Sequence, residues 1–315
     1  MMAEVFKPVR PEEVAAALAQ AKGPIEVRGR GTKQALGRPL ASGMAVLDLS
    51  GLTGITLYEP EELVLSARAG TPIAEVRATL AEKRQELIFD PPDLSGLFGG
   101  RDAGTLGGAI ACNLSGPRRI KGGSARDHIL GFSGVNGRGE AFKSGGRVVK
   151  NVTGFDLSKL IAGSYGTLAA MTEVTVKVLP RPEKIRTVLV FGMAAEAAVA
   201  AMRESLGSAH EIAAAAHVPA DAAKASAVPT VSGAGASVTA LRVEGPGPSV
   251  EYRCRALRGL LDARGASEEL HTRNSEIFWR EVRDVAFFAA YPNAQVWRLS
   301  GPPADGARAA GAIVA

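Results

Sequence analysis

Glycine is concentrated in one basic stretch of this chain. Residues 104–166 hold 15 of the 37 glycines, and the other 252 residues hold 22. Glycine loses more conformational entropy on folding than any other residue, so this stretch indicates close approach of the backbone to a ligand, or positive φ angles. The overlapping stretch 101–150 carries nine Lys or Arg and three Asp or Glu, a balance of +6. Glycine loops with local positive charge predict a bound anion, and a phosphate-bearing cofactor is the first candidate.

Composition and cysteine usage narrow the class of protein. The 315 residues suffice for one large domain or two smaller ones, and 46% hydrophobic with 22% charged residues is typical of a globular chain. No apolar run reaches the roughly 18 residues that span a bilayer, and the start lacks a hydrophobic signal core. Cys112 and Cys254 suit a reducing compartment, and no Cys/His spacing resembles a metal site. The interleaved glycines and the 5% aromatic content argue against nucleic-acid binding.

Periodicity and breaker residues predict two domains. The turn Leu179-Pro180-Arg181-Pro182 is the best boundary, so we expect domains at 1–182 and 183–315. Thr71 is expected to cap the second helix of the first domain. Expected helices are 11–22, 71–83, 194–207, 249–263 and 274–288, and expected strands are 25–28, 45–49, 62–68, 129–135, 140–142, 168–178, 238–243 and 295–299. Residues 301–315 show no clear element, and we expect the second domain to be incomplete at its end.

Four segments of the first domain have the composition of ligand-binding loops. Residues 28–33 follow a predicted strand, and successive amides in such a turn form a concave anion site. Residues 104–108 read as a glycine turn that opens a helix. The segments 122–127 and 163–167 are the third and fourth. Taken singly, each segment also fits a plain alternative: an ordinary turn, close helix packing through small residues, or a local ion pair.

Together these segments resemble a known family. In chain order they read R-G-x-G-T-K, D-P-P-D, G-T-L-G-G, G-S-x-R-D, K-N-V-T-G-F-D-L and G-S-Y-G-T-L, followed by T-E-V-T. This order resembles the FAD-binding domain of the vanillyl-alcohol oxidase/p-cresol methylhydroxylase (PCMH) superfamily and, within it, the E-type subunits of bacterial glycolate oxidases. The resemblance is dense over 1–182 and looser over 183–299. It implies an α+β fold: a PCMH-type FAD-binding domain of two α/β subdomains, followed by a smaller α+β cap domain.

The resemblance also implies which residues bind FAD. The first two loops would surround the pyrophosphate through backbone amides, and Pro91 would lie near the flavin ring and ribityl chain. Several family members attach FAD covalently to a histidine in the first loop, and Thr32 takes that position here, so FAD is expected to be non-covalent. The cofactor-binding residues implied are Gly29, Arg30, Gly31, Thr32, Lys33, Pro91, Gly104, Thr105, Leu106, Gly107, Gly108, Ser124, Asp127, Gly163, Ser164, Gly166, Thr167 and Glu173.

The function implied by the resemblance is oxidation of glycolate to glyoxylate by a complex. Expected partners are a paralogous FAD-binding D-type subunit and an iron–sulfur subunit that accepts the electrons. The expected location is cytoplasmic, peripheral at the inner face of the membrane through those partners. Two alternatives stay open: a stand-alone FAD-dependent oxidoreductase of a small hydroxy acid or alcohol, and an assembly subunit without its own catalysis. The H-x-G-D-G-N-x-H element of related cap domains is missing, so no catalytic or metal-binding residue is assigned.

Other polar residues near the glycine loops keep more than one interpretation. Arg118, Arg119 and Lys121 form a basic cluster that would bind a substrate carboxylate, the cofactor phosphate or an acidic partner, or would simply be solvated. His128 is favoured as a structural histidine over a catalytic base. Cys112 is favoured as a packed thiol over a redox group.

Overall fold

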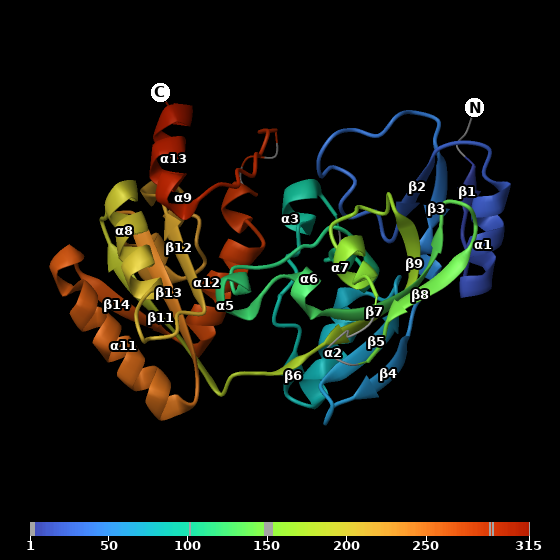
Figure 1. Ribbon diagram of the computed structural model, residues 1–315. Coiled ribbons are helices and arrows are strands. Elements are labelled where there is room, and N and C mark those ends of the chain that lie inside the picture. Colours follow the sequence, from blue (N-terminus) through green and yellow to red (C-terminus); the bar gives the residue numbers. More distant parts are fainter. Residues whose placement is uncertain (1–3, 101, 148–153, 290, 292, 315) are drawn as a thin grey trace. The chain divides into compact units, whose positions relative to one another are not determined.

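The computed structural model describes the chain except residues 1–3, 101, 148–153, 290, 292 and 315. Its contacts divide the chain into two units (Figure 1). Unit 1 is Met1–Gly116 with Gly123–Arg181, and unit 2 is Pro117–Gly122 with Pro182–Ala315. This division differs from the expected boundary by one residue and by the segment Pro117–Gly122. Within the described ranges, no helix is both long and apolar enough to cross a membrane.

A small parallel sheet begins unit 1. Its strands have the order β1-β3-β2, and one helix covers it. The helix starts at Pro11, whose missing N–H costs nothing at the first helical position, and it buries Val14 and Ala17 against Leu47. This subdomain contains β1 (Val5–Phe6), α1 (Pro11–Gln20), β2 (Ile25–Arg28) and β3 (Ala45–Asp48).

A five-stranded antiparallel sheet forms the second subdomain, in the order β4-β5-β9-β7-β8. The register of its central strand, β9, shifts between Met171 and Glu173, so Met171 and Val174 both contribute to a core shared with Phe89 and Leu106. The strands are β4 (Ile55–Glu59), β5 (Val64–Arg68), β7 (Ile129–Asn136), β8 (Ala141–Gly145) and β9 (Ala169–Lys177), with a separate pair β6 (Gln85–Glu86) and β10 (Leu179–Pro180). The helices are α2 (Ile73–Glu82), α3 (Ser95–Phe98), α4 (Leu106–Ala111), α6 (Ala125–His128) and α7 (Leu157–Ile161).

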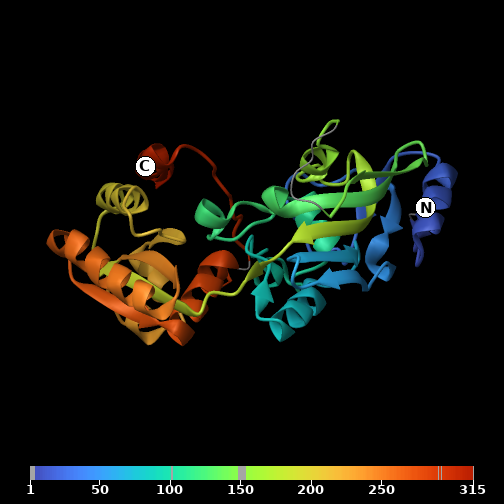
Figure 2. The same ribbon diagram turned by 60° about the horizontal axis from the view of Figure 1, so that its bottom comes forward.

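Unit 2 is one antiparallel sheet, in the order β12-β13-β11-β14, with helices on both faces (Figure 2). Successive residues of β11 serve opposite faces: Val188 and Val190 pack with α8 and α11, and Leu189 packs with α12. Its strands are β11 (Lys184–Phe191), β12 (Ala214–Val218), β13 (Val238–Gly245) and β14 (Ser267–His271). Its helices are α5 (Arg119–Gly122), α8 (Ala195–Leu206), α9 (Ala220–Ala223), α10 (Pro229–Ser232), α11 (Gly247–Leu261), α12 (Thr272–Arg283) and α13 (Gly306–Val314).

The α+β class is confirmed, and three local predictions are wrong. Residues 295–299 form no strand, and their side chains are exposed. The stretch expected to lack an element contains α13. The predicted cap Thr71 does not cap α2, because its hydroxyl instead accepts from the N–H of Gly54 and donates to its carbonyl, and Pro72 occupies the N-cap position.

Candidate cofactor-binding site

A cavity of about 300 Å³ lies in unit 1 between the two subdomains. Its walls come from β2, the loop 29–44, the start of α4, the turn 165–167 and β9. The lining includes ten of the eighteen predicted cofactor-binding residues: Gly29, Arg30, Gly31, Thr32, Lys33, Thr105, Gly107, Gly108, Gly166 and Thr167. The structure therefore brings together the first, second and fourth loops, which are far apart in sequence.

The first loop presents free backbone donors. It begins where β2 ends at Arg28, and Gly31 has φ +71°, a conformation that glycine adopts without steric cost. The N–H groups of residues 30–33 donate no hydrogen bond to any described residue. Four consecutive unpaired amides beside a cavity are suited to bind an anion.

The second loop forms part of the cavity wall, but the amides of residues 106–108 are not free to donate hydrogen bonds to a ligand. The N–H of Leu106 donates to Thr71, and the N–H of Gly107 donates to Ala69, both at 2.9 Å. The N–H of Gly108 donates to the Thr105 hydroxyl, which caps α4. The amides expected to bind pyrophosphate at 106–108 thus already donate within the chain. Glycine at 107 is required by packing, since a Cβ there would lie 2.7 Å from the Ala69 carbonyl oxygen.

Lys33 joins the two loops. Its Nζ donates to the carbonyl of Ala103 at 3.1 Å, and Arg30 pairs with Asp102 at 2.6 Å. Burial lowers the pKa of the Lys33 ammonium below its ordinary value of 10.5, although nearby acidic groups, Asp102 among them, oppose that shift. No carboxylate within the described ranges forms an ion pair with Lys33. A half-buried cation without a carboxylate partner is suited to bind an anionic ligand.

The rest of the lining fits a dinucleotide. Four cationic side chains line the cavity against one carboxylate, that of Glu26, which accepts from Gln34 at 2.8 Å. Apolar side chains supply the remaining surface, among them Val27, Leu36, Leu49, Ala69, Ala111 and Met171. Cations suit a diphosphate, and apolar walls suit aromatic rings. The residues present therefore fit FAD.

Eight predicted residues lie outside the cavity lining, and several have other partners. Ser124 and Asp127 form a capping box at the start of α6, with 2.7 Å between the Ser124 nitrogen and an Asp127 oxygen. Glu173 pairs with Arg68 on the adjacent strand at 3.4 Å. The remaining members of this group are Pro91, Gly104, Leu106, Gly163 and Ser164. Their contacts with FAD stay predictions, and the K-N-V-T part of the family pattern, 150–153, lies outside the described residues.

Sixteen lining residues are not among the predicted cofactor-binding residues, Arg28, Arg38 and Leu40 among them. Arg28 ends the predicted strand 25–28, so its place beside the first loop was readable from the sequence. No motif covers residues 34–44, and only the fold brings them to the cavity.

His128 and Cys112 occupy different environments. His128 is 5% exposed, its ring lies 5.8 Å from that of Phe89, and it is outside the cavity lining. Cys112 lines the cavity at the end of α4. Burial raises the pKa of its thiol, so the thiol is protonated at neutral pH.

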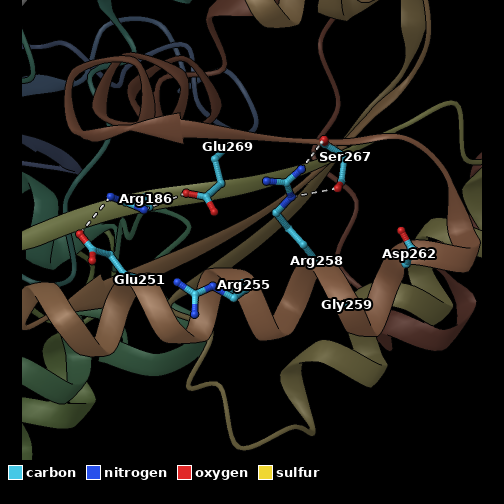
Figure 3. Close-up of a pocket in the computed structure, with 8 residues that line it drawn as sticks. All are labelled: Arg186, Glu251, Arg255, Arg258, Gly259, Asp262, Ser267 and Glu269. Atoms are coloured by element: carbon cyan, nitrogen blue, oxygen red, sulfur yellow. Dashed lines mark hydrogen bonds and ion pairs between the residues drawn. The ribbon is translucent and has the colours of Figure 1, made fainter.

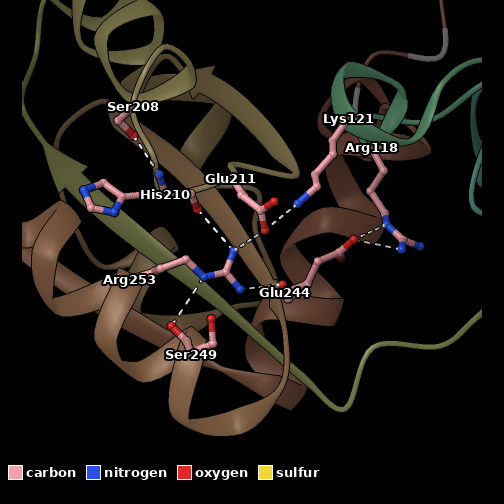
Figure 4. A network of polar contacts seen from close by, with 8 residues as sticks. All are labelled: Arg118, Lys121, Ser208, His210, Glu211, Glu244, Ser249 and Arg253. Carbon is pink, nitrogen blue, oxygen red and sulfur yellow. Dashed lines mark hydrogen bonds and ion pairs between the residues drawn. The ribbon is translucent and has the colours of Figure 1, made fainter.

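The basic cluster 118–121 makes ion pairs within unit 2 (Figure 4). Arg118 donates through Nε and Nη2 to one oxygen of Glu244, at 3.2 and 2.9 Å, and Arg242 donates to the other at 2.8 Å. Lys121 pairs with Glu211 at 3.1 Å. Burial raises the pKa of the Glu244 carboxyl, but Arg118 and Arg242 outweigh that effect and hold it below its ordinary value. Acidic groups of this chain therefore satisfy two of the three cluster residues.

The Arg118–Glu244 pair predicts a stability effect. Arg118 is 4% exposed, so Arg118→Met removes one of two cations that offset the largely buried carboxylate of Glu244. We expect the free energy of unfolding of unit 2 to fall by about 3 kcal/mol. Urea unfolding measures this change, with Arg119→Met at an exposed neighbouring position as the control, expected to differ from the parent by less than about 0.5 kcal/mol. Equal stability of the two variants would show that the buried pair contributes nothing.

A second cavity, of about 490 Å³, lies in unit 2 between α11 and β14 (Figure 3). Its charges are largely compensated: Arg186 pairs with Glu251 at 3.2 Å and with Glu269 at 3.0 Å, and Arg258 donates to the Ser267 hydroxyl. No sequence motif predicted this cavity.

The first part of the chain is similar to known FAD-binding domains. The family described as "FAD binding domain" matches residues 2–145. The glycolate oxidase subunit GlcE of Escherichia coli (strain K12) is 45% identical over 161 residues, which are 51% of this chain and 44% of that protein. The glycolate oxidase subunit GlcD of Bacillus subtilis (strain 168) is 34% identical over 166 residues, 53% of this chain and 34% of that protein. The chain thus spans less than half the length of these relatives.

The fold has a solved counterpart. The structure of p-cresol methylhydroxylase with substrate bound superimposes with a TM-score of 0.71 at 15% identity, over 90% of this chain and 63% of that one. At 15% identity, this structural likeness shows the fold alone. The support for FAD comes from the family match over residues 2–145. Residues 2–145 therefore match an FAD-binding domain, and the chain shares the fold of p-cresol methylhydroxylase.

Proposed function

We propose that this chain is the FAD-binding subunit of a complex that oxidises glycolate to glyoxylate. The observation that carries the proposal is the 45% identity to the GlcE subunit over 161 residues. That relative is named as a subunit of glycolate oxidase. Its name supports glycolate as the substrate and a multi-subunit complex as the assembly.

The first loop and its surroundings would hold the cofactor. The amides of residues 30–33 and the ammonium of Lys33 would donate to the diphosphate, and the apolar lining would contact the ring systems. FAD, when bound, supplies the chemistry of hydride acceptance from a hydroxy acid. The chain's own part is to bind and orient the cofactor and to neutralise its charge.

The proton of the substrate hydroxyl needs an acceptor. Glu26 is the one carboxylate among the described cavity residues, and Gln34 already donates to it. We therefore propose that a paralogous D-type subunit completes substrate oxidation and that an iron–sulfur subunit receives the electrons. The cytoplasmic location, peripheral at the membrane through these partners, belongs to the same proposal.

Turnover of glycolate with a dye acceptor tests this assignment. The chain is purified alone and with co-expressed D-type and iron–sulfur subunits, and flavin content and dye reduction are measured for both samples. We expect flavin in both and glycolate-dependent dye reduction by the complex alone. Turnover by the single chain at the rate of the complex would instead favour a stand-alone oxidoreductase. A folded chain without flavin, from cells supplied with FAD, would favour a role in assembly.

Attachment of the cofactor gives a separate prediction. Thr32 stands where some family members carry the histidine that forms the flavin bond, and a threonine hydroxyl lacks that imidazole nucleophile. We expect acid precipitation to release all of the FAD into the supernatant. Flavin fluorescence that stays with the polypeptide on a denaturing gel would contradict non-covalent binding.

A further inference from the structure

A short segment beside the cavity has no assigned role. Residues 37–43, here called the strap, connect the first loop to β3 and place Arg38 and Leu40 in the cavity lining. The strap makes no hydrogen bond with any other described residue. Just before it, the hydrogen bond from Gln34 to Glu26 holds the chain at β2. Within the described ranges, no hydrogen bond therefore holds the strap in place.

Two glycines bound the strap, and both have a positive φ angle. Gly37 has φ +88° and Gly43 has φ +81°, and a Cβ at either position would meet no atom within 4 Å. A side chain would therefore have room at both positions. Glycine is favoured there because the positive φ angle is one that glycine adopts without steric cost. Leu40 is 57% exposed although it lines the cavity, so its apolar surface is only partly covered.

The strap also carries positive charge to the cavity. Arg38 forms no ion pair within the described ranges, whereas Arg30 is occupied by Asp102. A guanidinium group binds phosphate oxygens in bidentate geometry. Arg38 thus matches the anionic part of a dinucleotide in the same cavity.

We propose that the strap closes over bound FAD, and that Arg38 then donates hydrogen bonds to its diphosphate while Leu40 becomes covered. This proposal rests on the proposed function, because it needs FAD in the cavity. Arg38 is thereby a cofactor-binding residue outside the family motif, and the strap sets how slowly FAD leaves.

Hydrogen exchange of the full chain tests closure. Exchange in the strap is followed by mass spectrometry for the apoprotein and for samples saturated with FAD, ADP or riboflavin. We expect FAD and ADP, which carry a diphosphate, to slow strap exchange about tenfold or more, and riboflavin to leave it unchanged. Unchanged strap exchange in an FAD-saturated sample, or equal protection by riboflavin, would overturn closure on the diphosphate.

Affinity measurements test Arg38 itself. Arg38→Gln should raise the Kd for FAD about tenfold, equivalent to about 1.4 kcal/mol. Arg138→Gln removes the same charge from the exposed β7–β8 turn of unit 1 and should leave the Kd unchanged. Equal Kd values for the two variants would overturn the role of Arg38. A folded parent chain that binds no FAD would instead refute the proposed function, and this proposal with it.

Discussion

Gly107→Val is expected to destabilise unit 1 by about 3 kcal/mol and to abolish FAD binding as a consequence. A Cβ at position 107 would lie 2.7 Å from both the Cβ and the carbonyl oxygen of Ala69, and 3.0 Å from its Cα. The contact involves backbone, which no rotamer change relieves, and it would displace α4 from the end of β5. Thermal unfolding and flavin content of the purified variant measure the two effects.

Gly108→Ala separates packing from ligand binding. Position 108 also lines the cavity, but a Cβ there would approach only the Thr105 hydroxyl at 3.1 Å and the Lys33 ammonium at 3.9 Å. Alanine favours a helix over glycine, so the variant should remain folded. We expect weaker FAD binding without loss of stability. A Gly107→Val protein as stable as its parent would contradict the packing role assigned to this glycine.

Lys33→Met is expected to weaken FAD binding about 100-fold, or about 2.7 kcal/mol. The variant removes a half-buried cation without a carboxylate partner from a site proposed to hold a diphosphate. Stability should change by less than about 1 kcal/mol, since loss of the hydrogen bonds to the Ala103 carbonyl and the Thr32 hydroxyl is offset by relief of a buried charge. Lys33→Arg keeps the charge and should retain most of the affinity. Equal affinity of parent and Lys33→Met would remove Lys33 from the site.

The same lysine predicts a dependence on pH. FAD binding needs the protonated ammonium, so affinity should fall as pH rises through the pKa of Lys33, which burial lowers from 10.5. The stability of the apoprotein should change in the opposite sense: between the lowered pKa and 10.5 the unfolded chain binds more protons, so stability rises with pH. FAD titrations of the parent across this range should show the loss, and Lys33→Met should show no such dependence.

Much of unit 1 could be predicted from local sequence signals. Pro11 with Glu12 and Glu13 predicts the start of α1, and the alternation in residues 168–178 predicts β9. The spacing of the glycines predicted the loops that meet at the cavity. That spacing could not tell free amides from bonded ones. Whether the N–H of Gly107 faces a ligand or the carbonyl of Ala69 depends on how α4 docks against β5.

The structure of unit 2 was harder to predict, because its sequence signals are weak or depend on residues far apart in the chain. The strand β12 is mostly alanine, which favours helix by intrinsic propensity, and pairing with β13 overrides that preference. The ion-pair partner of Arg118 is Glu244, which lies 126 residues further along the chain, so local sequence could not predict it. The apolar residues at 295–299 suggested a strand, but no partner strand pairs with them among the described residues.

We expect the cavity of unit 1 to hold one FAD without a covalent bond. Titration of the refolded or acid-stripped apoprotein with FAD, followed by flavin fluorescence, tests it most directly when the parent and Lys33→Met are compared. We expect saturation at one FAD per parent chain and a Kd about 100-fold higher for the variant. Binding of equal strength in both proteins, or no binding by a folded parent, would contradict it.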